Sequence, residues 1–188
     1  MNQTPVTLHA ILMADLEAVA ALHCASWRTA YRGILSDAYL DGDLLSDRRE
    51  VWHLKLAMIT DRQFGWLAKH DGEPVGFAFA SLDDDHTWGT LVDNLHLLSS
   101  HQSAGIGRGL LTAVAKVAHA RATHPGLFLW CYEQNTPARG FYEHLGAEAV
   151  EHTMYAAPDG YTVPDCRYAW RSLAPLLPVN EPGQPELV

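Results

Sequence analysis

The chain has 188 residues, 48% of them hydrophobic, which suits one folded domain with a sizeable core. Thirteen Lys and Arg against 22 Asp and Glu give a formal net charge of −9, which argues against a general nucleic-acid-binding protein. The same charge is compatible with a cationic substrate such as an amine. No apolar run is long enough to span a membrane, and the first residues lack the pattern of a secretory signal, so we expect no membrane partner.

The three cysteines, Cys24, Cys131 and Cys166, lie far apart in apolar surroundings. An odd, scattered set does not make a disulfide framework, and the chain has no Cys-x-x-Cys pair for zinc. The 11 histidines do not fall into a metal-ligand spacing with nearby Cys or Glu. We therefore predict reduced, buried thiols, no metal site and a cytoplasmic location.

The first part of the chain predicts a strand and two helices. Residues 6–10 favour a strand, and residues 15–31 have apolar side chains near helical spacing, with Asp15 as N-cap. Residues 46–62 favour a second helix that begins at a Ser46 cap.

The period then changes to that of strands. Residues 64–70 and 75–82 predict a hairpin around Asp71-Gly72, and residues 88–98 predict a long strand. The remaining elements, in chain order, are expected to be a helix at 107–123, a strand at 127–132, a helix at 136–146, and strands at 149–157 and 161–170.

This order predicts a single α/β or α+β domain with a mixed sheet over residues 1–173. Residues 174–188 contain four prolines after Ala174, and we expect this C-terminal tail to be flexible or loosely attached.

The stretch HQSAGIGRGLL (101–111) places three glycines where a helix should begin. Glycines let a phosphate approach the unpaired amides of a helix N-terminus, so the stretch can serve as a pyrophosphate cradle. The alternative is a turn that only reverses the chain. A P-loop would need Lys after Gly107, where Arg108 stands, and residues 119–132 lack the acid of a dinucleotide-binding site.

Two motifs in this chain resemble those of the GNAT superfamily of N-acetyltransferases. Gln102-x-x-Gly105-x-Gly107, between an apolar strand and a helix, is similar to the acyl-CoA signature. NTPARGFYEHLGA (135–147), after the next strand, is similar to the Asn-x-x-Ala-x-x-Phe-Tyr segment, in the order the family requires. The resemblance covers most of residues 6–170 and implies a mixed, mostly antiparallel sheet of about seven strands, flanked by helices, with a splayed central strand pair.

The resemblance implies acetyl-CoA as co-substrate. The segment around 102–108 would hold the pyrophosphate, the strand backbone near 95–97 would meet the pantetheine arm and the acetyl carbonyl, and Asn135 and Tyr142 would lie near the pantetheine and the sulfur. The implied cofactor-binding residues are Leu95, His96, Leu97, Gln102, Ser103, Ala104, Gly105, Ile106, Gly107, Arg108, Asn135 and Tyr142.

Acetyl transfer needs a neutral amine, a stabilised oxyanion and a thiolate that can leave. We expect direct attack by the amine in a ternary complex, with Tyr142 protonating the sulfur. Some relatives carry a glutamate base on the strand at 127–132, where the corresponding position here is Trp130. Glu133, His96 and Asp93 are the candidate bases that remain, and a water chain is a further alternative.

The acceptor pocket is expected from residues 27–45, where Trp27, Tyr31 and Tyr39 are aromatic, and from the loop near 155–165. We therefore predict an N-acetyltransferase for a primary amine of a small molecule or an amino-acid derivative. Acetylation of a protein N-terminus or lysine, and a non-catalytic acyl-CoA-binding regulatory module, are the alternatives. A homodimer through the last strands is also expected from the resemblance.

Overall fold

The computed structural model describes residues 5–102 and 104–178. It contains one seven-stranded sheet in the order β1-β2-β3-β4-β5-β7-β6. Its strands are β1 (Thr7–Ala10), β2 (Gln63–His70), β3 (Glu73–Asp85), β4 (Gly89–Leu97), β5 (Leu127–Tyr132), β6 (Glu148–Ala156) and β7 (Thr162–Trp170). Its α-helices are α1 (Leu16–Ala30), α2 (Asp37–Leu40), α3 (Leu44–Ala57), α4 (Ile106–Arg121) and α5 (Thr136–His144), with short 3-10 turns at Met13–Asp15 and Ser99–His101.

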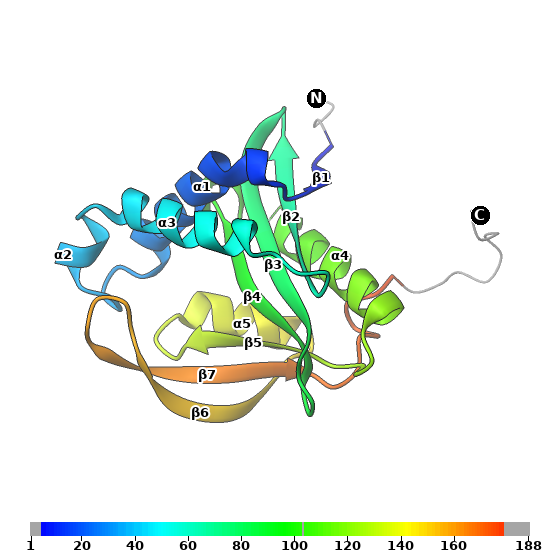
Figure 1. Cartoon of the computed structure of the whole chain (residues 1–188). Helices are drawn as coiled ribbons and strands as arrows, with labels where there is room; N and C mark the ends of the chain where they lie inside the picture. Colours follow the sequence, from blue (N-terminus) through cyan, green and yellow to red (C-terminus); the bar gives the residue numbers. More distant parts are fainter. Residues whose placement is uncertain (1–4, 103, 179–188) are drawn as a thin grey trace.

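Among the strands of the described residues, only the β4–β5 pair is parallel, and the other pairs are antiparallel. In Figure 1 the strands β1–β4 run steeply, whereas β5, β7 and β6 run across the lower part of the molecule. The sheet thus has two halves that meet at the β4–β5 pair, as the mixed-sheet prediction requires.

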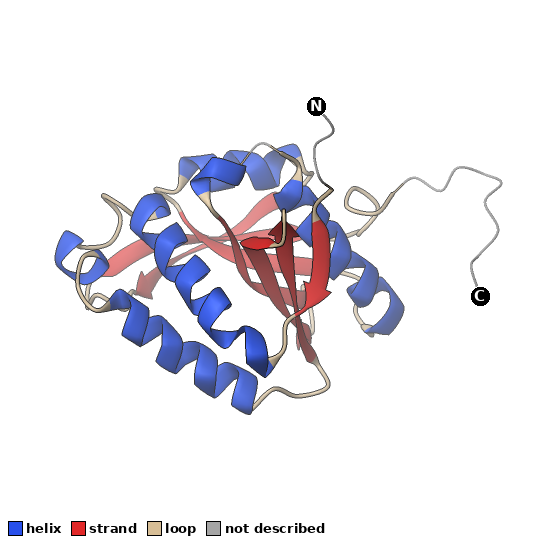
Figure 2. Ribbon diagram, turned by 90° about the horizontal axis from the view of Figure 1, so that it is seen from above, coloured by secondary structure: helices blue, strands red, loops and turns tan. Residues whose placement is uncertain are grey.

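Helices α1 and α3 lie side by side over the N-terminal half of the sheet (Figure 2). Their apolar sides bury Val19 and Trp52 against Phe77 and Phe79 of β3. Because side chains alternate across a strand, Ala78 and Ala80 belong to the opposite face.

Helices α4 and α5 cover that opposite face and close the main core. Leu110 and Val114 of α4 and Tyr142 of α5 pack with Leu129 of β5 and Trp170 of β7. Burying apolar groups of this size contributes roughly 1.5–3 kcal/mol per side chain, so this layer fixes both helices on the sheet.

Several local expectations differ from the structure. Helix α3 ends at Ala57, whereas the sequence analysis expected it to continue to residue 62. Asp43, not Ser46, is the N-cap of α3, because the Asp43 carboxylate accepts a hydrogen bond from the Ser46 amide. Residues 174–178 are not a loose tail: Leu176 is buried in the main core and its carbonyl accepts a hydrogen bond from Thr112 Oγ1 at 2.9 Å. The local Pro content suggested flexibility, but two leucines in this segment supply enough apolar surface to dock it.

All three cysteines are free in the structure and buried, so their predicted place in the core is confirmed. In the part of the chain that the structure describes, no helix combines the length and the apolar character needed to cross a bilayer.

Candidate active site

The first feature of the site is the divergence of β4 from β5. The two strands pair only through Thr90 with Leu127 and Leu91 with Phe128. Farther along, Leu95 to Leu97 remain paired with β3, but residues 92–97 have no recorded partner on β5. Backbone amides and carbonyls along this edge of β4 are therefore open to a ligand, and the predicted splay is confirmed.

The second feature is the N-terminus of α4, which follows β4 after the 3-10 turn Ser99–His101. Gly105 has φ +77°, a left-handed conformation that favours glycine, and the first helical hydrogen bond runs from Gly109 N to Gly105 O. The amides of Ile106, Gly107 and Arg108 therefore precede the first bonded turn and carry the partial positive charge of the helix end. Gln102 and Ala104 beside them are exposed, and Ser103 lies outside the described residues.

Gly107 is required for packing, whereas the sequence analysis expected it to let a phosphate approach the helix end. It is buried, and a Cβ built on it would lie 3.1 Å from Phe141 Cζ and 3.6 Å from Leu97 Cδ1. This glycine permits close packing between α4 and α5. Of the two motif glycines, Gly105 is the one whose missing side chain leaves open space at the helix end.

Helix α5 brings the second motif to the same face of the sheet. Asn135 caps α5 by accepting a hydrogen bond from Ala138 N at 3.4 Å. The ring of Tyr142 is buried against Tyr168 and Trp170. Burial raises the pKa of Tyr142 well above its ordinary value, so the phenol keeps its proton and can act as a hydrogen-bond donor or an acid.

The structure separates the candidate bases. His96 turns toward α1, where its Nδ1 lies 3.2 Å from Ser26 Oγ and its ring lies 4.5 Å from that of His23. Burial, with a smaller effect of Arg48, lowers the pKa of His96 to about 3, which makes it a weak proton acceptor.

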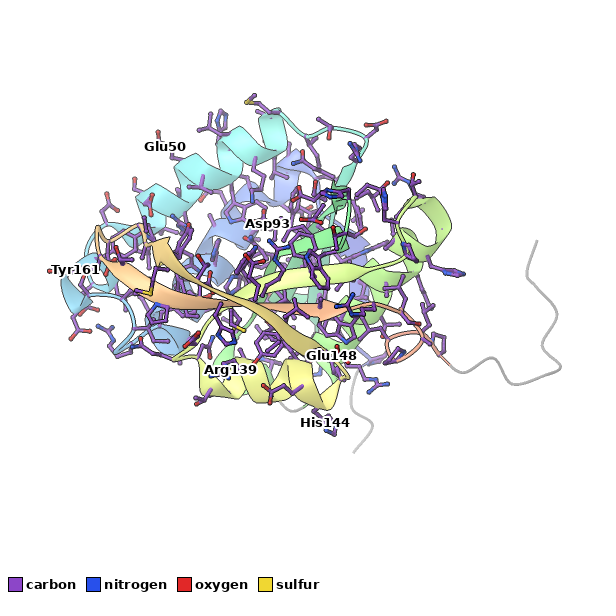
Figure 3. The ribbon with its side chains drawn as sticks, turned by 90° about the horizontal axis from the view of Figure 1, so that it is seen from below. Glu50, Asp93, Arg139, His144, Glu148 and Tyr161 are labelled. Atoms are coloured by element: carbon purple, nitrogen blue, oxygen red, sulfur yellow. The ribbon has the colours of Figure 1, made fainter. Side chains whose placement is uncertain are left out.

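Glu133 is engaged elsewhere as well, because its Oε1 lies 2.5 Å from His152 Nδ1 on β6. Asp93 forms an ion pair with Lys55 of α3. Figure 3 shows Asp93 near the middle of the molecule, between α3 and the β6–β7 hairpin in this view.

The third feature is a cavity of about 460 Å³ between the two halves of the sheet. Strands β4, β5, β6 and β7 and the end of α1 line it. The aromatic rings of Tyr31, Trp130, Tyr132 and Tyr155 and the carboxylates of Asp93 and Asp165 contribute to its wall. Of the aromatic residues expected in the acceptor pocket, Tyr31 lines this cavity, whereas Trp27 and Tyr39 do not: Trp27 packs on Arg48, and Tyr39 donates a hydrogen bond to Asp47.

Sequence reasoning missed Asp165. Its side chain is buried on β7, and the only hydrogen bond recorded to its carboxylate in the described chain comes from the Cys166 amide at 3.0 Å. Burial raises its pKa to about 6. The signal that could have found it is an acid inside the mostly apolar strand 162–170, because Asp is seldom buried without a partner.

The chain matches the model of the Acetyltransferase (GNAT) family over residues 19–147. It belongs to this family. A probable N-acetyltransferase of Mycobacterium tuberculosis is 29% identical over 181 residues, which cover 93% of this chain and 99% of the relative. The protein is therefore an N-acetyltransferase of the GNAT family, as the resemblance implied.

Solved structures of GNAT enzymes share the fold. A GCN5-related N-acetyltransferase from Rhodopseudomonas palustris has a TM-score of 0.69 at 22% identity, covering 90% of this chain and 97% of its own. The PaiA N-acetyltransferase from Thermoplasma acidophilum, solved in complex with coenzyme A, has a TM-score of 0.68 at 17% identity, covering 86% and 98%. These likenesses establish the α+β fold with its parallel β4–β5 pair.

Proposed function

We propose that this enzyme transfers the acetyl group of acetyl-CoA to the primary amine of a small molecule, by direct attack in a ternary complex. The observation that carries the proposal is the alignment of three features along β4: the open edge at 92–97, the free amides at the α4 N-terminus, and the cavity beyond.

Acetyl-CoA fits these features by charge and shape. The pyrophosphate would lie on the amides of residues 102–108, where the helix end favours an anion and Arg108 is exposed. The pantetheine arm would follow the open edge at Leu95–Leu97, with Asn135 and Tyr142 on the α5 side. A relative of the same fold was solved with coenzyme A, which supports this placement.

The chemistry follows from the donors nearby. A backbone amide near Leu97 would polarise the acetyl carbonyl, and the Tyr142 phenol would donate a proton to the departing sulfur. Burial raises the pKa of the Cys131 thiol to about 12, so this cysteine is not a nucleophile at neutral pH. This argues against an acetylated Cys131 as an intermediate and supports direct transfer to the amine.

A small acceptor is favoured over a protein terminus or lysine because the cavity has a volume typical of small-molecule sites. The cytoplasmic location and the homodimer expected from the sequence remain predictions, and size-exclusion chromatography with light scattering tests the second.

Calorimetric titration of acetyl-CoA into the protein tests the cofactor assignment. We expect saturable binding, weakened about tenfold by Arg108→Glu, because the new carboxylate faces the pyrophosphate at the positive end of α4. Lys116→Glu is the matched control, since it makes the same charge change on an exposed turn of α4 away from its N-terminus. Failure of the folded wild type to bind acetyl-CoA would overturn the proposal, and thiol release with added amines then measures turnover.

A further inference from the structure

We propose that the 460 Å³ cavity is the acceptor site, that it selects amines lacking a carboxylate, and that Asp165 pairs with the ammonium group and removes its proton. This inference rests on the proposed function and adds to it the acceptor class and the residue that activates the acceptor.

Charge balance singles out Asp165 among the acids of the cavity. Asp93 is already neutralised by Lys55, and Glu133, the residue after β5, pairs with His152. In the described ranges 5–102 and 104–178, no Lys, Arg or His lies within 4 Å of the Asp165 carboxylate, although the residue is only 5% exposed. A buried carboxylate without a cation is costly, and an ammonium ion in the cavity would supply the missing charge.

The aromatic walls suit the same ligand. Tyr31, Trp130, Tyr132 and Tyr155 offer ring faces and edges to an apolar body and to a cationic head. No Lys or Arg is among the described residues that line the cavity. The cations beside the wall are already paired, Lys55 with Asp93, and Arg167 (over the Trp130 ring) with Asp85 and Glu151. A carboxylate on the acceptor would therefore meet the unpaired Asp165 and no free cation, so the cavity disfavours α-amino acids.

The cavity lies next to the place expected for the acetyl group. The Tyr31 ring is 5.0 Å from the Tyr132 ring on β5 and 6.5 Å from the His96 ring on β4. Tyr31 therefore lies near side chains of both diverging strands, and it also lines the cavity. Burial is the main cause of the raised pKa of Tyr31, and smaller effects of Tyr142 and Asp165 show that both groups lie near this phenol.

The proposed step balances as follows. The Asp165 carboxylate takes one proton from the ammonium, and the freed nitrogen lone pair attacks the acetyl carbonyl carbon. The carbon–nitrogen bond forms, the carbon–sulfur bond breaks, and its electron pair leaves on sulfur, which takes a proton from Tyr142. The new amide nitrogen loses its extra proton to the Tyr142 oxygen, and Asp165 releases its proton to solvent.

Paired substrates test the selectivity. We would measure thiol release from acetyl-CoA with 2-phenylethylamine against phenylalanine, and with putrescine against ornithine, since the members of each pair differ only in the carboxylate. We expect kcat/KM to be at least tenfold higher for the member without a carboxylate. Tyr155→Lys, which places a cation at a half-exposed position of the wall, should narrow that ratio.

Asp165→Asn tests the role of the carboxylate. We expect kcat/KM for 2-phenylethylamine to fall at least 100-fold, with a fall in kcat as well as a rise in KM, while the Kd of acetyl-CoA stays within twofold of the wild type. Asp84→Asn is the matched control, because Asp84 is exposed at the end of β3 and outside the cavity.

The outcomes separate this inference from the proposed function. Failure of the folded wild type to bind acetyl-CoA would overturn the proposed function itself. If the wild type binds acetyl-CoA, three results would overturn the acceptor-site proposal alone. These are full activity of Asp165→Asn, a preference for phenylalanine and ornithine over the amines without a carboxylate, and no acetylation of any of the four amines.

Discussion

Burial of the ionised Asp165 carboxylate lowers the stability of the folded protein. Its pKa is about 6 in the folded state, against 3.8 for an ordinary Asp. Because the folded pKa is the higher one, the folded state loses stability relative to the unfolded chain as the pH rises from 4 to 6, and the loss is complete above 6. The shift corresponds to about 3 kcal/mol.

We therefore expect Asp165→Asn to raise the free energy of unfolding by up to about 3 kcal/mol at pH 8, and by much less at pH 4. Urea unfolding at the two pH values measures this. Equal effects at both pH values, or a destabilised variant at pH 8, would show that the carboxylate carries no such penalty. A gain in stability with a loss of activity is the trade expected of a functional buried charge.

Tyr142 is a second residue where packing and chemistry can be separated. In the described chain its hydroxyl makes no hydrogen bond, so Tyr142→Phe removes a proton donor and keeps the ring that packs on Tyr168 and Trp170. We expect kcat to fall about 10²-fold, the effect typical of losing a general acid, with the midpoint of urea unfolding unchanged. An active Tyr142→Phe enzyme would reduce this tyrosine to a core aromatic.

At the scale of the element, helix α4 uses its glycines for two purposes. A side chain at Gly107 would enter the contact with Phe141, whereas a Cβ at Gly109 would meet nothing within 4 Å. We expect Gly107→Leu to destabilise the protein by about 1–3 kcal/mol through overpacking, and Gly109→Leu to stabilise it by a few tenths to about 1 kcal/mol through helix propensity. Thermal unfolding of the two variants measures both changes in stability. A destabilised Gly109→Leu together with an unchanged Gly107→Leu would contradict the two roles given to these glycines.

The sequence predicted most elements because their patterns are local. The strand at 127–132 has the predicted limits, and the Asp71-Gly72 hairpin joins β2 to β3 as expected. The sequence analysis missed the four-residue helix α2. It also placed the start of α3 two residues late, because Asp43 supplies the cap that Ser46 was expected to provide. Such boundaries depend on which of several polar side chains reaches the first free amide, and the sequence offers more than one.

At the scale of the whole molecule, residues 173–178 pack on the main core and bond to α4. Leu173 and Leu176 are buried in the main core, and Arg108 donates a hydrogen bond to the Pro175 carbonyl. The α4 N-terminus, which the proposed function assigns to the pyrophosphate, is therefore supported by residues far along the chain.

We expect Leu176→Ala to cost about 2–4 kcal/mol of stability, because it leaves a cavity beneath α4. Leu177→Ala, at the half-exposed neighbouring position, should cost less than half as much. Urea unfolding of the two variants measures the difference, and equal small effects would mean that the segment is only loosely docked.

By itself the sequence determined the family, the fold class and the two motifs that flank the β4–β5 opening, because spacing within one stretch of chain fixes a helix end or a strand. Only the tertiary structure decided which side chains meet in the cavity. Tyr31 follows the last residue of α1, Trp130 lies on β5 and Asp165 lies on β7. They share one space because the diverging strands leave a gap that the core does not fill. The burial that raises the pKa of Asp165, and the absence of a cation near it in the described ranges, likewise depend on contacts between distant segments, which the order of residues alone does not reveal.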